Sequence, residues 1–187
     1  MLEYLAWYAV QVHTRYEKQC ETILVDKGYE IFLPTYMKRK LPSQFTCEVP
    51  LFPGYLFCRF TANVTGKIVT TPGVLRIVSN GNVPAHVDDS EIARVKQITQ
   101  SSVAKMPWRY LPAGCRVRIE NGPLAGVEGF LEEDSGCARL VVSISMLCRS
   151  VAAVLDPSTI LTPLSCKRPG YVTNDERRFA MKLAAGM

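Results

Sequence analysis

Histidine is scarce in this chain, which has only His13 and His86 among 187 residues. The seven cysteines are scattered singly, and no two of them form the Cys-x-x-Cys spacing of a zinc or redox site. The sequence also lacks a phosphate-binding glycine loop and any Ser/His/Asp or Cys/His set at plausible spacing. These absences argue against an enzyme, and we expect no catalytic residue, no metal site and no cofactor.

Long apolar runs are missing as well. The longest are short strand-like pieces such as residues 140–142, whereas a membrane-spanning helix needs about 20 apolar residues. The N-terminus shows no basic region followed by the apolar region of a signal peptide. We expect a cytoplasmic protein that acts as a monomer without membrane contact. In that compartment the cysteines are expected to be reduced and to behave as small buried hydrophobic residues.

What the chain does contain is a globular composition, with 48% hydrophobic residues and a net charge of +5. In its first hundred residues, Thr14 followed by Glu17 has the capping-box pattern of a helix start. Asp88 followed by Glu91 repeats that pattern. Alternation and composition predict strands at residues 7–12, 29–33, 55–60 and 74–78. This order predicts an α+β domain over residues 5–100, with an antiparallel sheet flanked by helices.

The densest aromatic block of the chain lies at residues 49–60. A Pro53-Gly54 turn leads into a strand in which Tyr55 and Phe57 point to one face and Leu56 to the other. Two amphipathic helices are available to cover the Leu56 face. The side that carries the two rings, with Phe52 just before the turn, is therefore the better candidate for a partner outside the chain.

The pattern changes after residue 100. Residues 101–111 lack a period and predict a flexible linker. Short strands separated by glycines over residues 112–162 predict a small SH3-like, five-stranded β-barrel. Alternation predicts that five side chains point into its core: Val117, Ile119, Leu140, Val142 and Ile144. Residues 163–187 are expected to form a tail in which residues 174–185 have a weak helical pattern.

Two motifs in order carry a resemblance to a known family. Pro-Leu-Phe-Pro-Gly-Tyr-Leu-Phe at residues 50–57 and the glycine-rich run at residues 117–129 resemble the N-terminal domain and the KOW domain of NusG transcription factors. The resemblance covers roughly residues 5–161. It implies that the N-terminal domain binds the clamp helices of the largest RNA polymerase subunit beside upstream DNA, which disfavours pausing. It also implies that the KOW domain recruits a ribosomal protein or the termination factor Rho.

The resemblance further implies roles for particular residues, with ordinary packing or solvated surface as the alternative for each. The polymerase-binding patch corresponds to Phe52, Tyr55 and Phe57. Basic residues expected near the non-template DNA strand are His13, Arg15, Lys18, Lys38, Arg39 and Lys40. The partner-binding edge of the barrel corresponds to Leu124, Val127, Met146 and Leu147.

Departures from the general family pattern favour a specialised, RfaH-like antitermination paralogue. They are aliphatic residues at the barrel edge, Cys148 where glycine is usual, and the added tail. Local preference still favours a stable barrel over a helical hairpin for the C-terminal region. The alternative function is a KOW-type RNA-binding or ribosome-associated module. Acidic residues such as Glu120, Glu128 and Glu132 on the barrel argue for a protein partner instead.

Overall fold

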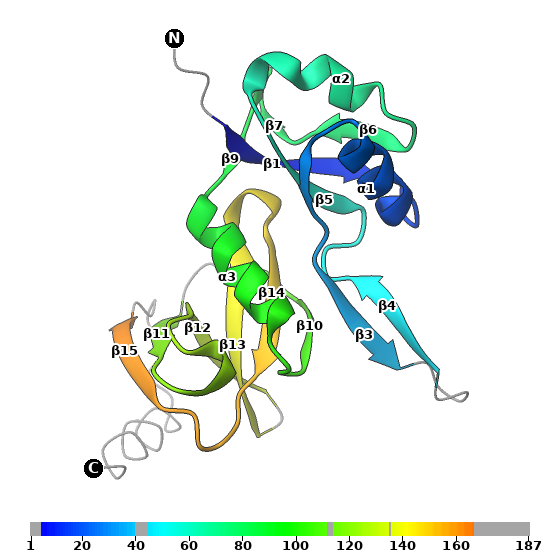
Figure 1. Cartoon of the computed structure of the whole chain (residues 1–187). Helices are drawn as coiled ribbons and strands as arrows, with labels where there is room; N and C mark the ends of the chain where they lie inside the picture. The colour runs from blue at the N-terminus through cyan, green and yellow to red at the C-terminus, as the bar shows by residue number, and fades with distance from the viewer. Residues whose placement is uncertain (1–4, 40–44, 112–113, 135, 167–187) are drawn as a thin grey trace.

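The computed structural model describes residues 5–39, 45–111, 114–134 and 136–166 of the chain (Figure 1). Its N-terminal half is built on a five-stranded antiparallel sheet with the order β2-β5-β1-β6, in which β9 also pairs with β1. The strands are β1 (Ala6–Val12), β2 (Glu30–Phe32), β5 (Tyr55–Phe60), β6 (Val74–Ile77) and β9 (His86–Val87). The predicted α+β class and the predicted strands of this half are confirmed.

Two helices pack on one face of this sheet. They are α1 (Glu17–Asp26) and α2 (Thr65–Val69), and the 3-10 turn η1 (Ala62–Val64) precedes α2. Cys20 and Leu24 of α1 and Ile68 of α2 are buried against alternate residues of β1 and β5, namely Tyr8, Val10, Val12, Leu56, Cys58 and Phe60. Within the described residues, no helix combines the length and apolar character needed to cross a membrane.

The third helix, α3 (Asp89–Gln100), lies over the opposite face. Ile92, Val95 and Ile98 are buried on one side of α3, because residues three apart lie on the same face of a helix. They form one apolar cluster with Trp7 and Phe57 of the sheet. Full burial of each such side chain stabilises the fold by roughly 1.5–3 kcal/mol. The predicted capping box of α3 is confirmed for Asp88, whose side chain accepts a hydrogen bond from the N–H of Ser90 at 2.7 Å. The carboxylate of Glu91 bonds Ser145 instead of completing the box.

The predicted capping box of α1 is wrong. The helix begins at Glu17, its N-cap residue is Tyr16, and no side chain caps it. The carboxylate of Glu17 accepts a hydrogen bond from the N–H of Gly54 instead, so the residue serves a contact that is distant in sequence.

A two-stranded hairpin extends from the sheet and includes part of the basic segment after residue 35. Strands β3 (Thr35–Arg39) and β4 (Thr46–Pro50) pair with each other and project away from the body of the molecule (Figure 1). A smaller hairpin of β7 (Ser79–Asn80) and β8 (Val83–Pro84) turns at residues 81–82.

The C-terminal half forms a six-stranded antiparallel sheet with the order β10-β14-β13-β12-β11-β15. The strands are β10 (Lys105–Trp108), β11 (Cys115–Ile119), β12 (Glu128–Asp134), β13 (Cys137–Ile144), β14 (Arg149–Val154) and β15 (Leu161–Cys166). Short 3-10 turns η2 (Gly122–Leu124) and η3 (Ser145–Leu147) connect some of them. The predicted inward set is buried, with exposures of 0–3%: Val117, Ile119, Leu140, Val142 and Ile144. The region is strand throughout these elements, as predicted, and not a helical hairpin.

The strand count and two boundaries differ from the sequence prediction. Residues 105–108, which we assigned to the linker, form β10, because all four pair in antiparallel register with residues 150–153 of β14. The last strand, β15, runs over Leu161–Cys166 and so extends into the segment that we assigned to the tail, residues 163–187. The sheet therefore has six strands and not five. The predicted helix at residues 174–185 lies outside the described residues.

One expectation about the cysteines is also corrected. Among the described residues, five cysteines are free: Cys20, Cys47, Cys58, Cys137 and Cys148. Cys115 is disulfide-bonded, contrary to the expectation of reduced thiols throughout. It lies on β11, whose pairing with β15 puts Cys166 opposite it in the backbone register. Because Cys166 was assigned to the tail, the pairing of strands β11 and β15 was not expected from the sequence.

Candidate protein-docking face

The turn that leads into β5 positions the aromatic residues of the candidate site. Gly54 has a φ of +80°, a left-handed conformation that glycine adopts without strain. Its N–H donates to the carboxylate of Glu17 at 2.9 Å, and its carbonyl oxygen accepts from the N–H of Val12 at 2.9 Å. The N–H of Tyr55 donates to the carbonyl oxygen of Phe52 at 3.0 Å. Hydrogen bonds to both β1 and α1 therefore fix the start of β5.

The docking face, defined as Phe52, Tyr55 and Phe57, is brought together by this turn. The rings of Phe52 and Phe57 meet edge to face with centroids 5.6 Å apart, and both side chains have 0% exposure. Tyr55 is half-buried. In this arrangement the two phenylalanines are therefore packed inside the chain, which is the alternative that we considered from the sequence. The reason is that their side of the sheet, shared with Trp7 and Ala9, belongs to one apolar cluster that continues through α3 into the C-terminal sheet.

The C-terminal sheet reaches the docking face through Arg149, the first residue of β14. The guanidinium carbon of Arg149 lies 5.1 Å from the centroid of the Tyr55 ring, which is within the range of a cation–π contact. Arg149 follows η3, where the half-buried Met146 and Leu147 pack on the same apolar cluster. These two predicted partner-binding residues thus lie where the C-terminal sheet meets the rest of the chain.

The other two predicted partner-binding residues occupy a different environment. Leu124 at the end of η2 and Val127 just before β12 are 2% and 1% exposed. They are core residues here, which agrees with the packing alternative considered from the sequence. Of the four predicted residues, Leu124 and Val127 are therefore buried in the core, and Met146 and Leu147 retain some exposure.

The first basic group lies in the turn between β1 and α1. His13 and Arg15 are exposed, and Arg15 has a φ of +77°, which is uncommon for a residue with a side chain. Lys18, in the first turn of α1, forms an ion pair with Glu48 of β4. This hydrogen bond raises the pKa of Lys18 and, with a bond from Thr35, lowers the pKa of Glu48. The charge of Lys18 is therefore already paired within the chain.

The second basic group lies on the projecting hairpin. Lys38 and Arg39 are exposed near the outer end of β3, and Lys40 lies outside the described residues. The hairpin that carries them extends beyond the five-stranded sheet (Figure 1).

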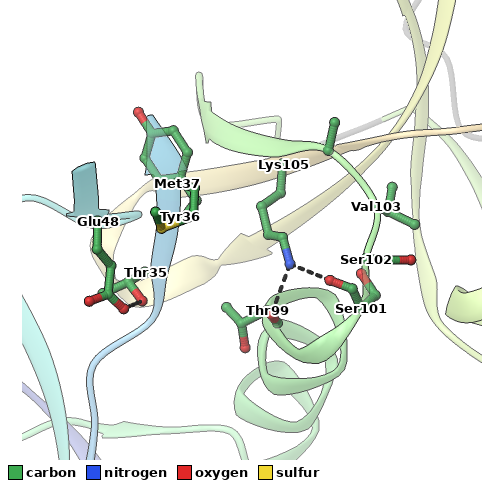
Figure 2. A pocket seen from close by; sticks show the side chains of 10 residues that line it. Thr35, Tyr36, Met37, Glu48, Thr99, Ser101, Ser102, Val103 and Lys105 are labelled. Carbon is green, nitrogen blue, oxygen red and sulfur yellow. Dashed lines mark hydrogen bonds between the residues drawn. The ribbon is translucent and has the colours of Figure 1, made fainter. Parts of the chain in front are cut away.

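A cavity of about 430 Å³ lies between the hairpin and the segment that joins α3 to β10 (Figure 2). Lys105 points into this joint, and its ammonium group donates to the carbonyl oxygens of Ile98, Thr99 and Ser101 at 2.7–2.8 Å. These carbonyls end α3, so Lys105 caps the helix from the C-terminal sheet. Burial lowers the pKa of Lys105. With its ammonium donors used in this way, Lys105 joins the two halves of the chain.

Surface arginines of the C-terminal sheet are paired with acidic groups. Arg116 and Arg118 both bond Glu128, at 2.8 and 2.6 Å, and Arg139 pairs with Asp134. Such pairing reduces the positive potential that a nucleic acid would meet on this surface.

Several residues that hold the site together were not identified from the sequence. Glu17 and Glu91 matched helix-capping patterns, but their carboxylates bond Gly54 and Ser145 across the fold. Arg149 carried no local signal. Only the strand alternation at Tyr55 and Phe57 could have indicated that something covers this face. In the part of the chain that the structure describes, no cluster of three or more His, Cys, Asp or Glu residues could hold a metal ion.

Comparisons with known proteins agree with this architecture. Residues 5–96 match the family model described as "NusG: Transcription termination factor nusG". The "Transcription termination/antitermination protein NusG" of Borreliella burgdorferi is 26% identical over 176 residues, which cover 81% of this chain and 95% of that protein. The protein of the same name from Escherichia coli K12 is 26% identical over 170 residues, covering 82% and 94%.

A solved structure shares the fold. The structure titled "Domain interaction in Thermotoga maritima NusG" matches with a TM-score of 0.54 and 22% identity, covering 87% of this chain and 98% of that chain. These relatives, described as transcription termination/antitermination proteins, support a role in transcription for this chain. The chain carries a NusG domain at residues 5–96, and NusG relatives align over most of its length.

Proposed function

We propose that this protein is a transcription elongation and antitermination factor that binds the clamp helices of the largest RNA polymerase subunit through the docking face. The observation that carries the proposal is the aromatic turn and strand at residues 52–57, which lies inside the segment matched by the NusG family model. Glu17 and the paired strand β1 hold this segment rigid, so little side-chain or backbone freedom is lost on binding.

The chemistry of the docking face suits a pair of helices. Tyr55 retains exposure and presents an amphipathic ring, while Phe52 and Phe57 form the apolar floor beneath it. Buried aromatic anchors of this kind dominate the binding energy of many interfaces. Helix-in-groove recognition uses the same apolar contacts.

The basic groups are proposed to lie beside upstream and non-template DNA. His13 and Arg15 in the β1–α1 turn, and Lys38 and Arg39 on the hairpin, are exposed and near enough to solvent to contact phosphates. Such contacts are weak, depend on salt and carry no base specificity. Lys18 contributes less than the sequence suggested, because it pairs with Glu48.

The C-terminal sheet is proposed to be the KOW domain, which recruits a ribosomal protein or Rho through η3 and its neighbourhood. Met146 and Leu147 offer half-exposed aliphatic surface there, whereas Leu124 and Val127 are buried core residues. The paired arginines of this sheet favour a protein over RNA as the partner. The proposed organisation is therefore an N-terminal domain over residues 5–100, a short connection and a KOW domain, in a cytoplasmic monomer.

Retention of the full-length protein on immobilised core RNA polymerase tests the proposal. Tyr55→Ala removes the accessible ring and should weaken retention by about tenfold or more, as expected for an interface hot spot. Leu75→Ala is the control, because Leu75 is an exposed aliphatic residue on β6 of the same sheet, with 47% exposure. Equal retention of the wild type and Tyr55→Ala would overturn the docking assignment. A run-off assay on a paused template would then show whether binding opposes or favours pausing.

A further inference from the structure

Two cysteines of the C-terminal sheet occupy facing positions on neighbouring strands. Cys115 is the first residue of β11, and the antiparallel pairing of β11 with β15 puts Cys166, the last residue of β15, opposite it. Cys115 is disulfide-bonded. We propose that Cys115 and Cys166 form a redox-active disulfide, which exchanges with small cellular thiols and controls how firmly β15 is held on the sheet.

The strand pairing itself favours this partner for Cys115. Facing residues on antiparallel strands have Cα atoms about 4.5–5.5 Å apart, and a disulfide requires a Cα separation of roughly 4.4–6.8 Å. The backbone of the sheet therefore brings Cys115 and Cys166 to bridging distance without any rearrangement. Every other cysteine in the described part of the chain has a free thiol: Cys20, Cys47, Cys58, Cys137 and Cys148.

The strand that carries Cys166 is weakly anchored by its own side chains. Residues 162–165 are exposed, so little apolar burial holds them on the sheet. Pro163 has no N–H to donate to a neighbouring strand. The pairing of the two strands also shifts register between Arg116 and Val117, which interrupts the regular ladder of hydrogen bonds. Because β15 ends the strand order, β11 is the neighbour that must hold it.

The two ends of β15 are held in different ways. Just before its start, the N–H of Ile160 donates to the side-chain oxygen of Asn121 at 2.7 Å, and the Asn121 amide donates to the carbonyl oxygen of Ser158 at 3.2 Å. The proposed cross-link restrains the opposite end, at Cys166. A strand that is fixed at one end and buries few side chains opens from its other end. Reduction should therefore release the Cys166 end of β15 while the Asn121 end stays in place.

The disulfide lies where a small thiol can reach it. Cys115 is half-buried at the end of its strand, and the neighbouring Arg116 is exposed. In the cytoplasm, disulfides that form are usually transient, and they act in catalysis or redox sensing. This step rests on the proposed function, which makes the protein a cytoplasmic factor. An accessible disulfide in that compartment exchanges with the glutathione pool instead of serving as a permanent cross-link.

Exchange with glutathione accounts for the bonds and electrons of the reaction. The thiolate of one cysteine attacks glutathione disulfide, forms a mixed disulfide and releases one glutathione thiolate. The thiolate of the other cysteine then attacks the mixed disulfide, closes the bond between Cys115 and Cys166, and releases the second glutathione. The protein gives up two electrons and two protons, which convert glutathione disulfide into two thiols. Reduction of the protein by glutathione follows the same steps in reverse.

Peptide mapping by mass spectrometry identifies the cross-link in the full-length protein. The protein is equilibrated with oxidised or reduced glutathione, quenched in acid, alkylated and digested without reductant. We expect the peptides that contain Cys115 and Cys166 to be joined after oxidised glutathione and separate after excess reduced glutathione. Joining of Cys115 to another cysteine, no joined peptide after oxidised glutathione, or a joined peptide that excess reduced glutathione leaves intact would each overturn the proposal.

Hydrogen exchange with mass spectrometry measures how firmly β15 is held. Backbone amides of residues 162–166 should exchange about tenfold faster, or more, in the reduced wild type than in the oxidised wild type. Amides of β13 at the centre of the sheet report on integrity of the fold and should exchange alike in both forms. Equal exchange of residues 162–166 in the two forms would overturn the control of β15. Faster exchange throughout β13 would also overturn it, because the opening would then be global.

Two variants separate the disulfide from a general effect of the reductant. Cys166→Ser should exchange rapidly at residues 162–165 in both glutathione buffers. Cys137→Ser is the matched control, because Cys137 is a free cysteine of the same sheet, and this variant should respond as the wild type does. A response to glutathione that survives in Cys166→Ser would overturn the proposal. None of these measurements uses RNA polymerase, so a failed Tyr55→Ala retention test and a failed redox test remain distinguishable.

Discussion

The carboxylate of Glu17 accepts a hydrogen bond from the backbone N–H of Gly54 at 2.9 Å, which joins the first residue of α1 to the turn before β5. Glu17 is only 4% exposed, so this bond forms away from water. It is the contact that sets where the aromatic strand begins. The position of the docking face thus depends on a residue that lies 37 positions earlier in the chain.

Replacing Glu17 by alanine should destabilise the protein by about 1–3 kcal/mol, because it leaves the buried N–H of Gly54 without an acceptor. Glu17→Gln keeps an oxygen acceptor and should lose less. Urea denaturation gives the free energy of unfolding of each variant. Asp26→Asn, which changes an exposed carboxylate at the end of α1, should match the wild type. A Glu17→Ala protein as stable as the control would show that the bond contributes nothing.

Phe57→Ala and Tyr55→Ala should separate stability from docking. Phe57 is fully buried between Phe52 and Phe32, so its truncation should cost about 3–5 kcal/mol of unfolding free energy. Tyr55 is half-buried, and its truncation should cost clearly less while weakening polymerase retention. Thermal unfolding followed by circular dichroism compares the two. If both variants lost the same stability, Tyr55 would have to be counted as a core residue.

Two glycine-to-alanine changes should act in opposite directions. A Cβ at Gly129 would lie 2.7 Å from the carbonyl oxygen of Val141 on the neighbouring strand β13, and two paired strands cannot separate cheaply. We expect Gly129→Ala to destabilise the C-terminal sheet by about 1–3 kcal/mol. Gly66 in α2 has open space around it, so Gly66→Ala should stabilise the protein by about 0.5–1 kcal/mol. Urea midpoints that move in the same direction for both variants would contradict this assignment.

These contrasts show which parts of the molecule the sequence could predict. The strands and their inward residues follow from alternation alone, as Val117 and Leu140 illustrate, because the side-chain period of a strand is local. The contact between the two halves could not be predicted in this way. It depends on Glu91, which bonds Ser145 more than 50 residues away, and on Arg149, which contacts Tyr55 on the other sheet. The residues next to Glu91 and Arg149 in the sequence do not indicate either partner. The docking residues were found from local pattern and family resemblance, but their burial depends on that long-range contact.

Thiol reactivity should follow burial. Desolvation raises the pKa of the Cys58 thiol to about 12, so at pH 7 on the order of one molecule in 100,000 carries the reactive thiolate there. Burial also raises the pKa of Cys20. Cys137 and Cys148 are exposed. Brief alkylation of the native protein followed by peptide mass spectrometry should therefore modify Cys137 and Cys148 and spare Cys58 and Cys20. All four should react in urea, and rapid native labelling of Cys58 would contradict the packing of β5 described above.

The stability of the C-terminal sheet should depend on pH through Glu128. The hydrogen bond from Arg118, with the charge of Arg116 close by, lowers the pKa of Glu128 below its usual 4.5. A lowered carboxyl pKa favours the ionised folded state, so its stabilisation is complete above pH 4.5 and is lost as pH falls through the folded pKa. For a surface network the effect is small, about 1 kcal/mol or less.

Glu128→Gln should have a lower urea midpoint than the wild type at pH 6, and the two should converge near pH 2. Glu133→Gln, an exposed carboxyl on the same strand, should keep the wild-type pH dependence. If Glu128→Gln had the same urea midpoint as the wild type at every pH, the ion pairs of Glu128 with Arg116 and Arg118 would not contribute to stability.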